Sequence, residues 1–170
     1  TPAIIAELAK YGVRARIETE YQDLIKEPVI DMLIKFMVCT NNRKRPKEWS
    51  FVEETLAELW RINGTQSYDA YDEMQRRLVA LANDIKQKIR QGFDEKEWHT
   101  IVKTMVEFCG VENIKAKFPG YKQGNYLGNL LNKFEGLFFS EYMETNSDWD
   151  LAIENFCGKH SIPIMTIHKS

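Results

Sequence analysis

The chain has 170 residues, of which 44% are hydrophobic and 28% charged, enough for one core of ordinary size or a core with a small satellite. Its 23 Lys and Arg against 25 Asp and Glu give a formal charge of -2, so any nucleic-acid-binding surface has to be a local one. No apolar run approaches the roughly 18 residues of a membrane span, and the first residues lack the pattern of a signal peptide. We therefore expect a cytoplasmic protein with no membrane partner.

The N-terminal segment predicts a short α/β unit. Thr1 and Pro2 are typical of a helix N-cap and first turn, apolar residues follow at helical spacing, and Gly12 ends the helix. The next stretch, "VRARIE" from Val13 to Glu18, alternates apolar and charged residues, which is the pattern of a half-buried strand.

The segment from Glu27 to Cys39, "EPVIDMLIKFMVC", predicts a helix buried on most of its faces. The polar and basic stretch "TNNRKRPKEW" that follows contains a proline and is the best candidate domain boundary. Beyond it, apolar residues recur every three or four positions and predict packed helices. The predicted stripes are Val52, Leu56, Leu59 and Trp60; Tyr71, Met74, Leu78, Leu81, Ile85 and Ile89; and Trp98, Ile101, Val102, Met105 and Phe108.

The stretch from Cys109 to Gly128 carries four glycines and a proline, which predicts the longest irregular segment of the chain. Two more helices are predicted after it, the second beginning behind the N-cap Asp148 and ending at Gly158. Their stripes are Leu127, Leu130, Leu131, Phe134, Leu137, Phe138 and Tyr142, then Trp149, Ala152, Ile153, Phe156 and Cys157. The final run "IPIMTIH" predicts a second strand.

The two predicted strands lie near opposite ends of the chain, and two lone strands do not stabilise themselves as a hairpin. We therefore expect both in one small sheet that is interrupted by a helical bundle over about residues 48 to 158. The predicted fold class is mainly α, a helical bundle inserted into a fragment of an α/β subdomain with few short strands. A first residue other than Met also favours a piece of a longer protein.

The last residues, "IPIMTIHKS", resemble the start of motif V in superfamily 1A helicases of the UvrD/Rep/RecB kind, where Lys-Gly-Leu-Glu follows. The segment "ELAKYGVRARIETEYQDLIKEPVIDMLIKFM" resembles the family's stretch just before its large insert. The resemblance implies that residues 1–42 and 161–170 belong to a RecA-like subdomain, 2A, and that residues 43–160 are the inserted helical subdomain, 2B. The parent protein would be an ATP-dependent 3'-to-5' DNA helicase or translocase.

Two residues of the second strand are the candidate single-stranded DNA contacts. Thr166 and His168 alternate with Ile167, so their side chains should leave the same face of the strand. The resemblance implies that this face lies along the DNA, and that Lys169 and Ser170 begin the turn toward the nucleotide. The alternative is that both are ordinary polar groups at a strand end, since a lone histidine is usually structural.

Other parts of the helicase motor are missing from this sequence. It contains no Gly-x-x-x-x-Gly-Lys-Ser/Thr phosphate loop, and the magnesium-holding Asp-Glu pair and the arginines that sense the γ-phosphate are absent too. We therefore expect no catalytic residues, metal or cofactor in this fragment, while ATP and Mg would serve the full-length protein.

Duplex DNA or a partner protein is the expected ligand of the helical insert, as the resemblance implies. The candidate duplex contacts are Lys115, Lys117 and Lys122, because the glycines around them would let backbone N–H groups approach phosphates. A second basic cluster, at the predicted boundary, comprises Arg43, Lys44, Arg45 and Lys47. Alternatively, these charges only keep the protein soluble. The acidic stretch from Glu141 to Glu154 is expected to face away from DNA.

Several residues favour a structural role. The aromatic residues on the stripes, such as Trp60, Trp98, Phe134 and Phe138, are predicted core rather than base-stacking groups. The cysteines, Cys39, Cys109 and Cys157, sit among apolar neighbours and predict buried, reduced thiols.

Two other classes of function remain open. An enzyme would need His99 or His160 beside Glu97 or Asp148, and no spacing supports such a pair. A helical protein–protein interaction module with no DNA role needs only an exposed apolar groove.

Overall fold

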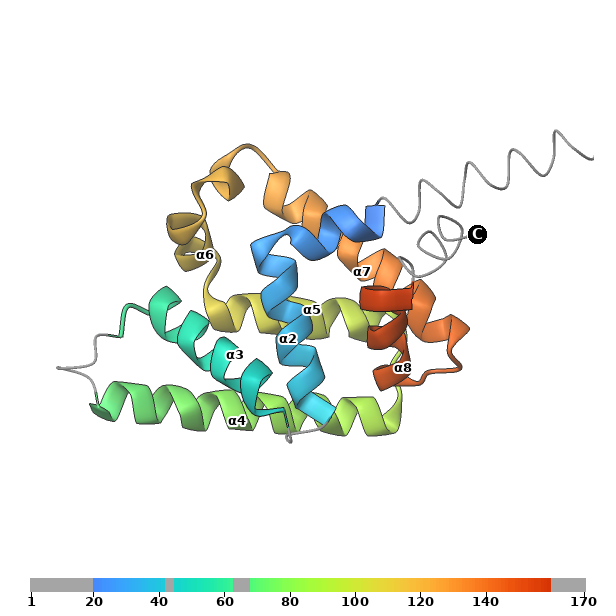
Figure 1. Cartoon of the computed structure of the whole chain (residues 1–170), viewed down its shortest axis with the longest axis horizontal. Helices are drawn as coiled ribbons and strands as arrows, with labels where there is room; N and C mark the ends of the chain where they lie inside the picture. The colour runs from blue at the N-terminus through green and yellow to red at the C-terminus, as the bar shows by residue number, and fades with distance from the viewer. Residues whose placement is uncertain (1–19, 42–44, 63–67, 160–170) are drawn as a thin grey trace, which may run out of the picture.

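The computed structural model describes residues 20–41, 45–62 and 68–159, and its regular elements there are helices (Figure 1). A helix over residues 20–26 precedes the others. The others are α2 Pro28–Asn41, α3 Pro46–Leu59, α4 Tyr68–Gln91, α5 Glu95–Cys109, α6 Val111–Lys117, the 3-10 helix η1 Pro119–Lys122, α7 Tyr126–Glu144, α8 Trp149–Glu154 and the π-helix η2 Asn155–Lys159. The prediction of a mainly α protein is thus confirmed for the described residues.

The two predicted strands, Val13 to Glu18 and Ile162 to His168, lie outside the described residues. The single sheet that was expected to join them, and the RecA-like subdomain it would belong to, therefore stay predictions. Within the described ranges no helix is both long and apolar enough to cross a membrane.

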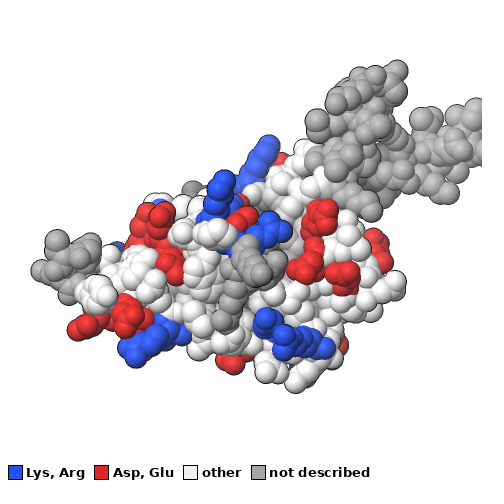
Figure 2. Space-filling view, turned by 60° about the horizontal axis from the view of Figure 1, so that its bottom comes forward, with Lys and Arg blue, Asp and Glu red and all other residues white. Residues whose placement is uncertain are grey.

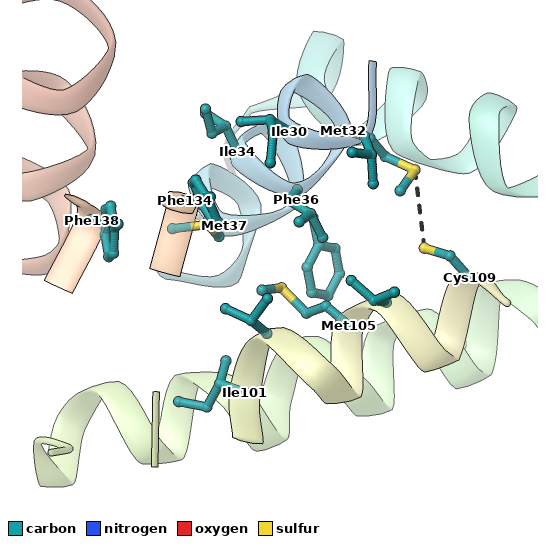
Figure 3. Packing of buried hydrophobic residues seen from close by; sticks show 14 of the residues in the cluster. Ile30, Met32, Ile34, Phe36, Met37, Ile101, Met105, Cys109, Phe134 and Phe138 are labelled. Atoms are coloured by element: carbon teal, nitrogen blue, oxygen red, sulfur yellow. Dashed lines mark hydrogen bonds between the residues drawn. The ribbon is translucent and has the colours of Figure 1, made fainter. Parts of the chain in front are cut away.

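Helix α2 was predicted to be buried on most of its faces, and this is confirmed, since nine of its 14 residues are buried. It packs against α3, α4 and α8. Figure 3 shows Phe36 of α2 beside Met105 of α5, and the sulfur of Met32 opposite the thiol of Cys109, 4.0 Å away. A helix surrounded in this way buries apolar side chains on most of its circumference, which explains why its sequence is apolar nearly all round.

Because of this packing, the predicted boundary at residues 42–43 does not separate two cores in the described part of the chain. Residues of α2 and of α3 to α8 belong to one hydrophobic cluster. The resemblance assigned α2 to the flanking subdomain, and the basic, proline-containing stretch after it was the candidate boundary. That loop only connects two helices that pack together.

Two long helices, α4 and α5, follow the expected stripes closely. In α4 the buried residues are Met74, Leu78, Ala82 and Ile85, spaced by three or four, and most of its other positions are exposed. Helix α5 begins with a capping box, in which the Asp94 carboxylate accepts from the Glu97 N–H at 2.7 Å and the Glu97 carboxylate accepts from the Asp94 N–H.

An aromatic cluster joins α5, α7 and α8 at one end of the bundle. Its members are Phe93, Trp98, Phe134, Phe138, Tyr142, Trp149 and Phe156, all buried. Ring centroids are 4.3 Å apart in the stacked pair of Phe93 and Tyr142, and 4.9 Å apart for Trp98 and Phe138. These contacts confirm that Trp98, Phe134 and Phe138 are core residues, and Trp60 packs against the same core while half-buried.

The first and last described helices meet. The ring of Tyr21 lies edge-on against that of Phe156, with centroids 4.7 Å apart, although 135 positions separate the two residues along the chain. The chain therefore enters and leaves this helical bundle at neighbouring points.

The prediction of an irregular stretch from Cys109 to Gly128 is wrong. It holds α6 and η1, and Gly128 lies inside α7. Glycine is required at Gly110, which ends α5 with a φ of +92° and donates its N–H to the Val106 carbonyl at 3.0 Å. Short helices separated by Gly110 and Pro119 produce a glycine-rich, proline-containing composition without being a loop.

Candidate nucleic-acid interface

The three candidate lysines of the insert lie on two consecutive short helices. Lys115 and Lys117 are in the last turn of α6, and Lys122 ends η1. Pro119 begins η1 directly after α6, which sets these groups on one projecting corner of the bundle (Figure 1). Positive charge in the last turn of a helix is favourable on its own account, so part of this charge has a structural explanation.

Lys117 is engaged within the protein. Its ammonium group forms an ion pair with the Glu58 carboxylate of α3 and lies 5.6 Å from the ring centroid of Phe118. An ammonium group held in this way is less available to a phosphate. Lys115 and Lys122 form no ion pair with another described residue, and Lys122 is exposed. These two are the stronger candidates for contact with a nucleic acid.

The glycines of this segment were expected to give phosphates access to backbone N–H groups, and this expectation is wrong for Gly110. The N–H of Gly110 is bonded inside its helix terminus. For Gly120 and Gly124, which lie on either side of Lys122, the expectation stays a prediction.

The described surface carries no continuous basic stripe on the face drawn in Figure 2, where basic and acidic side chains form small separate groups on a largely uncharged background. Helix α4 carries three basic residues toward its C-terminal end, Lys86, Lys88 and Arg90. Arg45 and Lys47 of the boundary cluster are exposed at the start of α3, and Arg43 and Lys44 lie outside the described residues.

The acidic stretch from Glu141 to Glu154 lies at the end of the molecule opposite α6 (Figure 1). Glu141 itself is buried beside the hydroxyl of Tyr21, 3.5 Å away, and Asp148 caps α8 by accepting from the Leu151 N–H at 3.1 Å. The Asp150 carboxylate accepts from the side-chain amide of Asn41 at 2.8 Å, so three of the five carboxylates have structural partners.

The single-stranded DNA candidates, Thr166 and His168, and the nucleotide-proximal pair, Lys169 and Ser170, lie outside the described residues. Their roles stay predictions.

In the described part His99 does not pair with Glu97 or Asp148, the partners that the enzyme hypothesis required. His99 lies 2.7 Å from Glu135 of α7, at the surface, while Glu97 and Asp148 serve as helix caps. His160 is not among the described residues, which also contain no group of His, Cys, Asp and Glu able to hold a metal ion.

One polar cluster was missed by the sequence analysis. The carboxylate of Glu27, at the bend before α2, accepts hydrogen bonds from the hydroxyls of Tyr121 at 2.8 Å and Tyr126 at 2.6 Å. Burial, followed by the bond to Glu27, raises the pKa of Tyr121, and the bond to Glu27 raises that of Tyr126. The partners are more than 90 residues apart, so no local sequence pattern could have brought them together.

Two of the three cysteines are buried, as expected, and all three are free thiols. Compared with known proteins, the chain matches no protein-family model, no curated protein and no solved structure.

Proposed function

We propose that this chain is a fragment of a UvrD/Rep/RecB-like DNA helicase, in which the helical bundle is the inserted 2B-type subdomain that contacts duplex DNA. The motor that hydrolyses ATP would lie outside the chain. The resemblance of two segments, residues 7–37 and 162–170, suggested this role.

The observation that carries the proposal is the contact between Tyr21 and Phe156, whose ring centroids are 4.7 Å apart. A domain inserted into a loop of another domain has to receive and return the chain at nearly the same place. A terminal helical domain has no such requirement. The described bundle meets the requirement.

The surface that the proposal assigns to duplex DNA is the corner of α6 and η1. Lys115 and Lys122 form no ion pair with any residue that the structure describes, and the paired Lys117 supports the corner against α3. With so few phosphate contacts, binding should be weak, with dissociation constants in the range of about 10⁻⁴ to 10⁻⁶ M, and should fall steeply as salt is added.

Fluorescence anisotropy with a labelled duplex, at several salt concentrations, tests this assignment. The variant Lys115→Glu/Lys122→Glu should bind more weakly, with a log–log salt slope smaller by about 2 than that of the unmodified chain. The matched control is Lys86→Glu/Lys88→Glu, which changes the net charge equally on α4. It should retain most of the binding.

Equal loss in both variants would mean that only net charge matters, and unchanged binding in the first variant would remove this surface from the proposal. An absence of duplex binding by the unmodified chain would favour the alternative, a helical protein–protein interaction module with no DNA role.

A further inference from the structure

The polar cluster around Glu27 has a half-exposed aromatic ring that is held in place. Tyr126 leaves 45% of its surface exposed, yet its hydroxyl is fixed by the Glu27 carboxylate at 2.6 Å. Its ring also stacks on that of the buried Tyr121, with centroids 5.8 Å apart and planes inclined by 20°. A surface ring fixed at both its tip and its face loses little conformational freedom when a ligand binds.

Tyr126 and Glu27 form the wall between two hollows in the surface. One, of about 330 Å³, is lined by aromatic residues including Phe118, Tyr121 and Tyr126. The other, of about 250 Å³, is lined by Asp23, Glu20 and Lys133 together with Glu27 and Tyr126. An aromatic compartment and an acidic one therefore share a single ring and a single carboxylate.

The charge of this region is unbalanced. Of the three carboxylates that line the acidic hollow, Glu20 has a cation nearby, the Lys133 ammonium group at 3.7 Å. Asp23 forms no ion pair with any described residue and is exposed. Glu27 receives only neutral phenol hydrogen bonds within the described part. Carboxylates beside an open aromatic face are complementary to a cation, and they repel phosphate.

We propose that this double hollow binds an arginine side chain of a partner polypeptide, with the guanidinium plane lying on the Tyr126 ring and its N–H groups donating to Asp23 and Glu27. A guanidinium group is planar, weakly hydrated and rich in donors, so it can stack on a ring and bond carboxylates at the same time. A lysine ammonium can do only one of these well. The site adjoins the proposed duplex surface at η1, where Lys122 stands between Tyr121 and Gln123, but it uses acidic and aromatic side chains rather than the lysines.

The Tyr121 hydroxyl also serves the fold, because the backbone N–H of Val29 donates to it at 3.4 Å. Tyr121 is 3% exposed and is therefore a support for the site. The exposed ring of Tyr126 and the exposed carboxylate of Asp23 are the groups that a ligand would touch, and changes at these two positions test binding with least effect on folding.

The experiment is a titration of the ¹⁵N-labelled chain, followed by NMR, with the blocked tripeptide acetyl-Gly-Arg-Gly-amide. The neutral control replaces arginine by citrulline, which keeps the shape of the side chain and removes its charge. The arginine peptide should shift the amide resonances of Gln123, Gly124 and Tyr126, with a dissociation constant of about 1 mM. The citrulline peptide should bind at least about tenfold more weakly, since both the cation–π contact and the ion pairing require charge.

Two variants and one control complete the test. Tyr126→Ala and Asp23→Asn should each weaken binding by about threefold or more, while Tyr68→Ala should leave it unchanged. Tyr68 is the suitable control because it is a tyrosine with 88% of its surface exposed and lines neither hollow.

The inference is overturned if citrulline and arginine bind equally, or if both Tyr126→Ala and Asp23→Asn bind like the unmodified chain. Equal affinity for acetyl-Gly-Lys-Gly-amide would show that the site binds any cation rather than a guanidinium group. Stronger shifts of the same resonances by a short oligothymidine would assign the ring to base stacking instead.

Discussion

The indole N–H of Trp149, at the start of α8, donates a hydrogen bond to the carbonyl oxygen of Met37 in α2, 3.1 Å away and 112 residues earlier in the chain. Two other tryptophans do the same between other helices. Trp98 of α5 donates to the carbonyl of Glu135 in α7 at 3.0 Å, and Trp60 after α3 donates to that of Phe108 in α5 at 3.2 Å. Each indole thus satisfies its one polar atom on the backbone of a neighbouring helix while its rings fill the core.

Replacing Trp149 by phenylalanine should lower the free energy of unfolding by about 2 kcal/mol or more, from the lost hydrogen bond and the space left by the smaller ring. Urea unfolding followed by circular dichroism measures the change. The control is Trp49→Phe in α3, since Trp49 is half-buried and its indole nitrogen makes no hydrogen bond to a described residue. A loss of similar size in the control would show that ring volume alone matters.

The hydroxyl of Tyr142 presents the opposite case. The side chain is fully buried in the aromatic cluster, and its oxygen has no hydrogen-bond partner among the described residues. A buried hydroxyl without a partner is unfavourable by about 1 to 3 kcal/mol. Tyr142→Phe should therefore leave the free energy of unfolding unchanged or raise it by about 1 kcal/mol.

Tyr121→Phe is the comparison for that prediction, because its hydroxyl donates to Glu27 and accepts from the Val29 N–H. It should lower the free energy of unfolding by about 1 to 2 kcal/mol. If both phenylalanine variants are destabilised equally, the Tyr142 hydroxyl has a partner that the described contacts do not include.

Helical periodicity predicted most of the described fold, because apolar residues spaced by three or four mark the buried face of a helix whatever it packs against. The stripes of α3, α4, α5 and α7 all follow this rule. Two features could not be predicted this way. Short helices such as α6 have too few residues for a stripe, and the position of α2 in the core depends on which helices surround it.

The candidate site shows the same limit. Lysine spacing in the sequence identified Lys115, Lys117 and Lys122, but the ion pair of Lys117 with Glu58 joins residues 59 positions apart. The cluster of Glu27, Tyr121 and Tyr126 also depends on tertiary packing. Single tyrosines and glutamates are too common for such a site to be predicted from the sequence.

Burial of the thiols should make stability depend on pH above about 9. It raises the pKa of Cys39 from 9.0 to about 11, and that of Cys109 to about 12. Between the two values the unfolded chain loses its thiol protons while the folded chain keeps them. The stabilisation is therefore complete below pH 9 and is lost as the pH rises through the folded-state values.

Urea unfolding at pH 8, 9 and 10 should show stability falling by up to about 1.4 kcal/mol per pH unit for each buried thiol. The variant Cys109→Ala should have a shallower dependence than the unmodified chain. At pH 8, both buried thiols should react with a thiol reagent only as fast as the protein opens. Reaction at the rate of an unfolded peptide would show that Cys39 or Cys109 is accessible.

The extent of the folding unit can be tested by truncation. The described core closes on itself where Tyr21 meets Phe156, and α2 lies within it in contact with α3, α4 and α8. We expect residues 20–159 to unfold cooperatively with a Tm within about 4 °C of that of the whole chain, a difference of about 1 kcal/mol. The matched comparison is residues 43–160, the insert as the resemblance delimits it, which lacks α2. Without that helix the apolar faces of α3, α4 and α8 lose their common partner, so this shorter piece should show no cooperative transition.

Differential scanning calorimetry of both pieces decides between the boundaries. A folded 43–160 piece would restore the sequence-based boundary, and a 20–159 piece that fails to fold would show that its flanks complete the core.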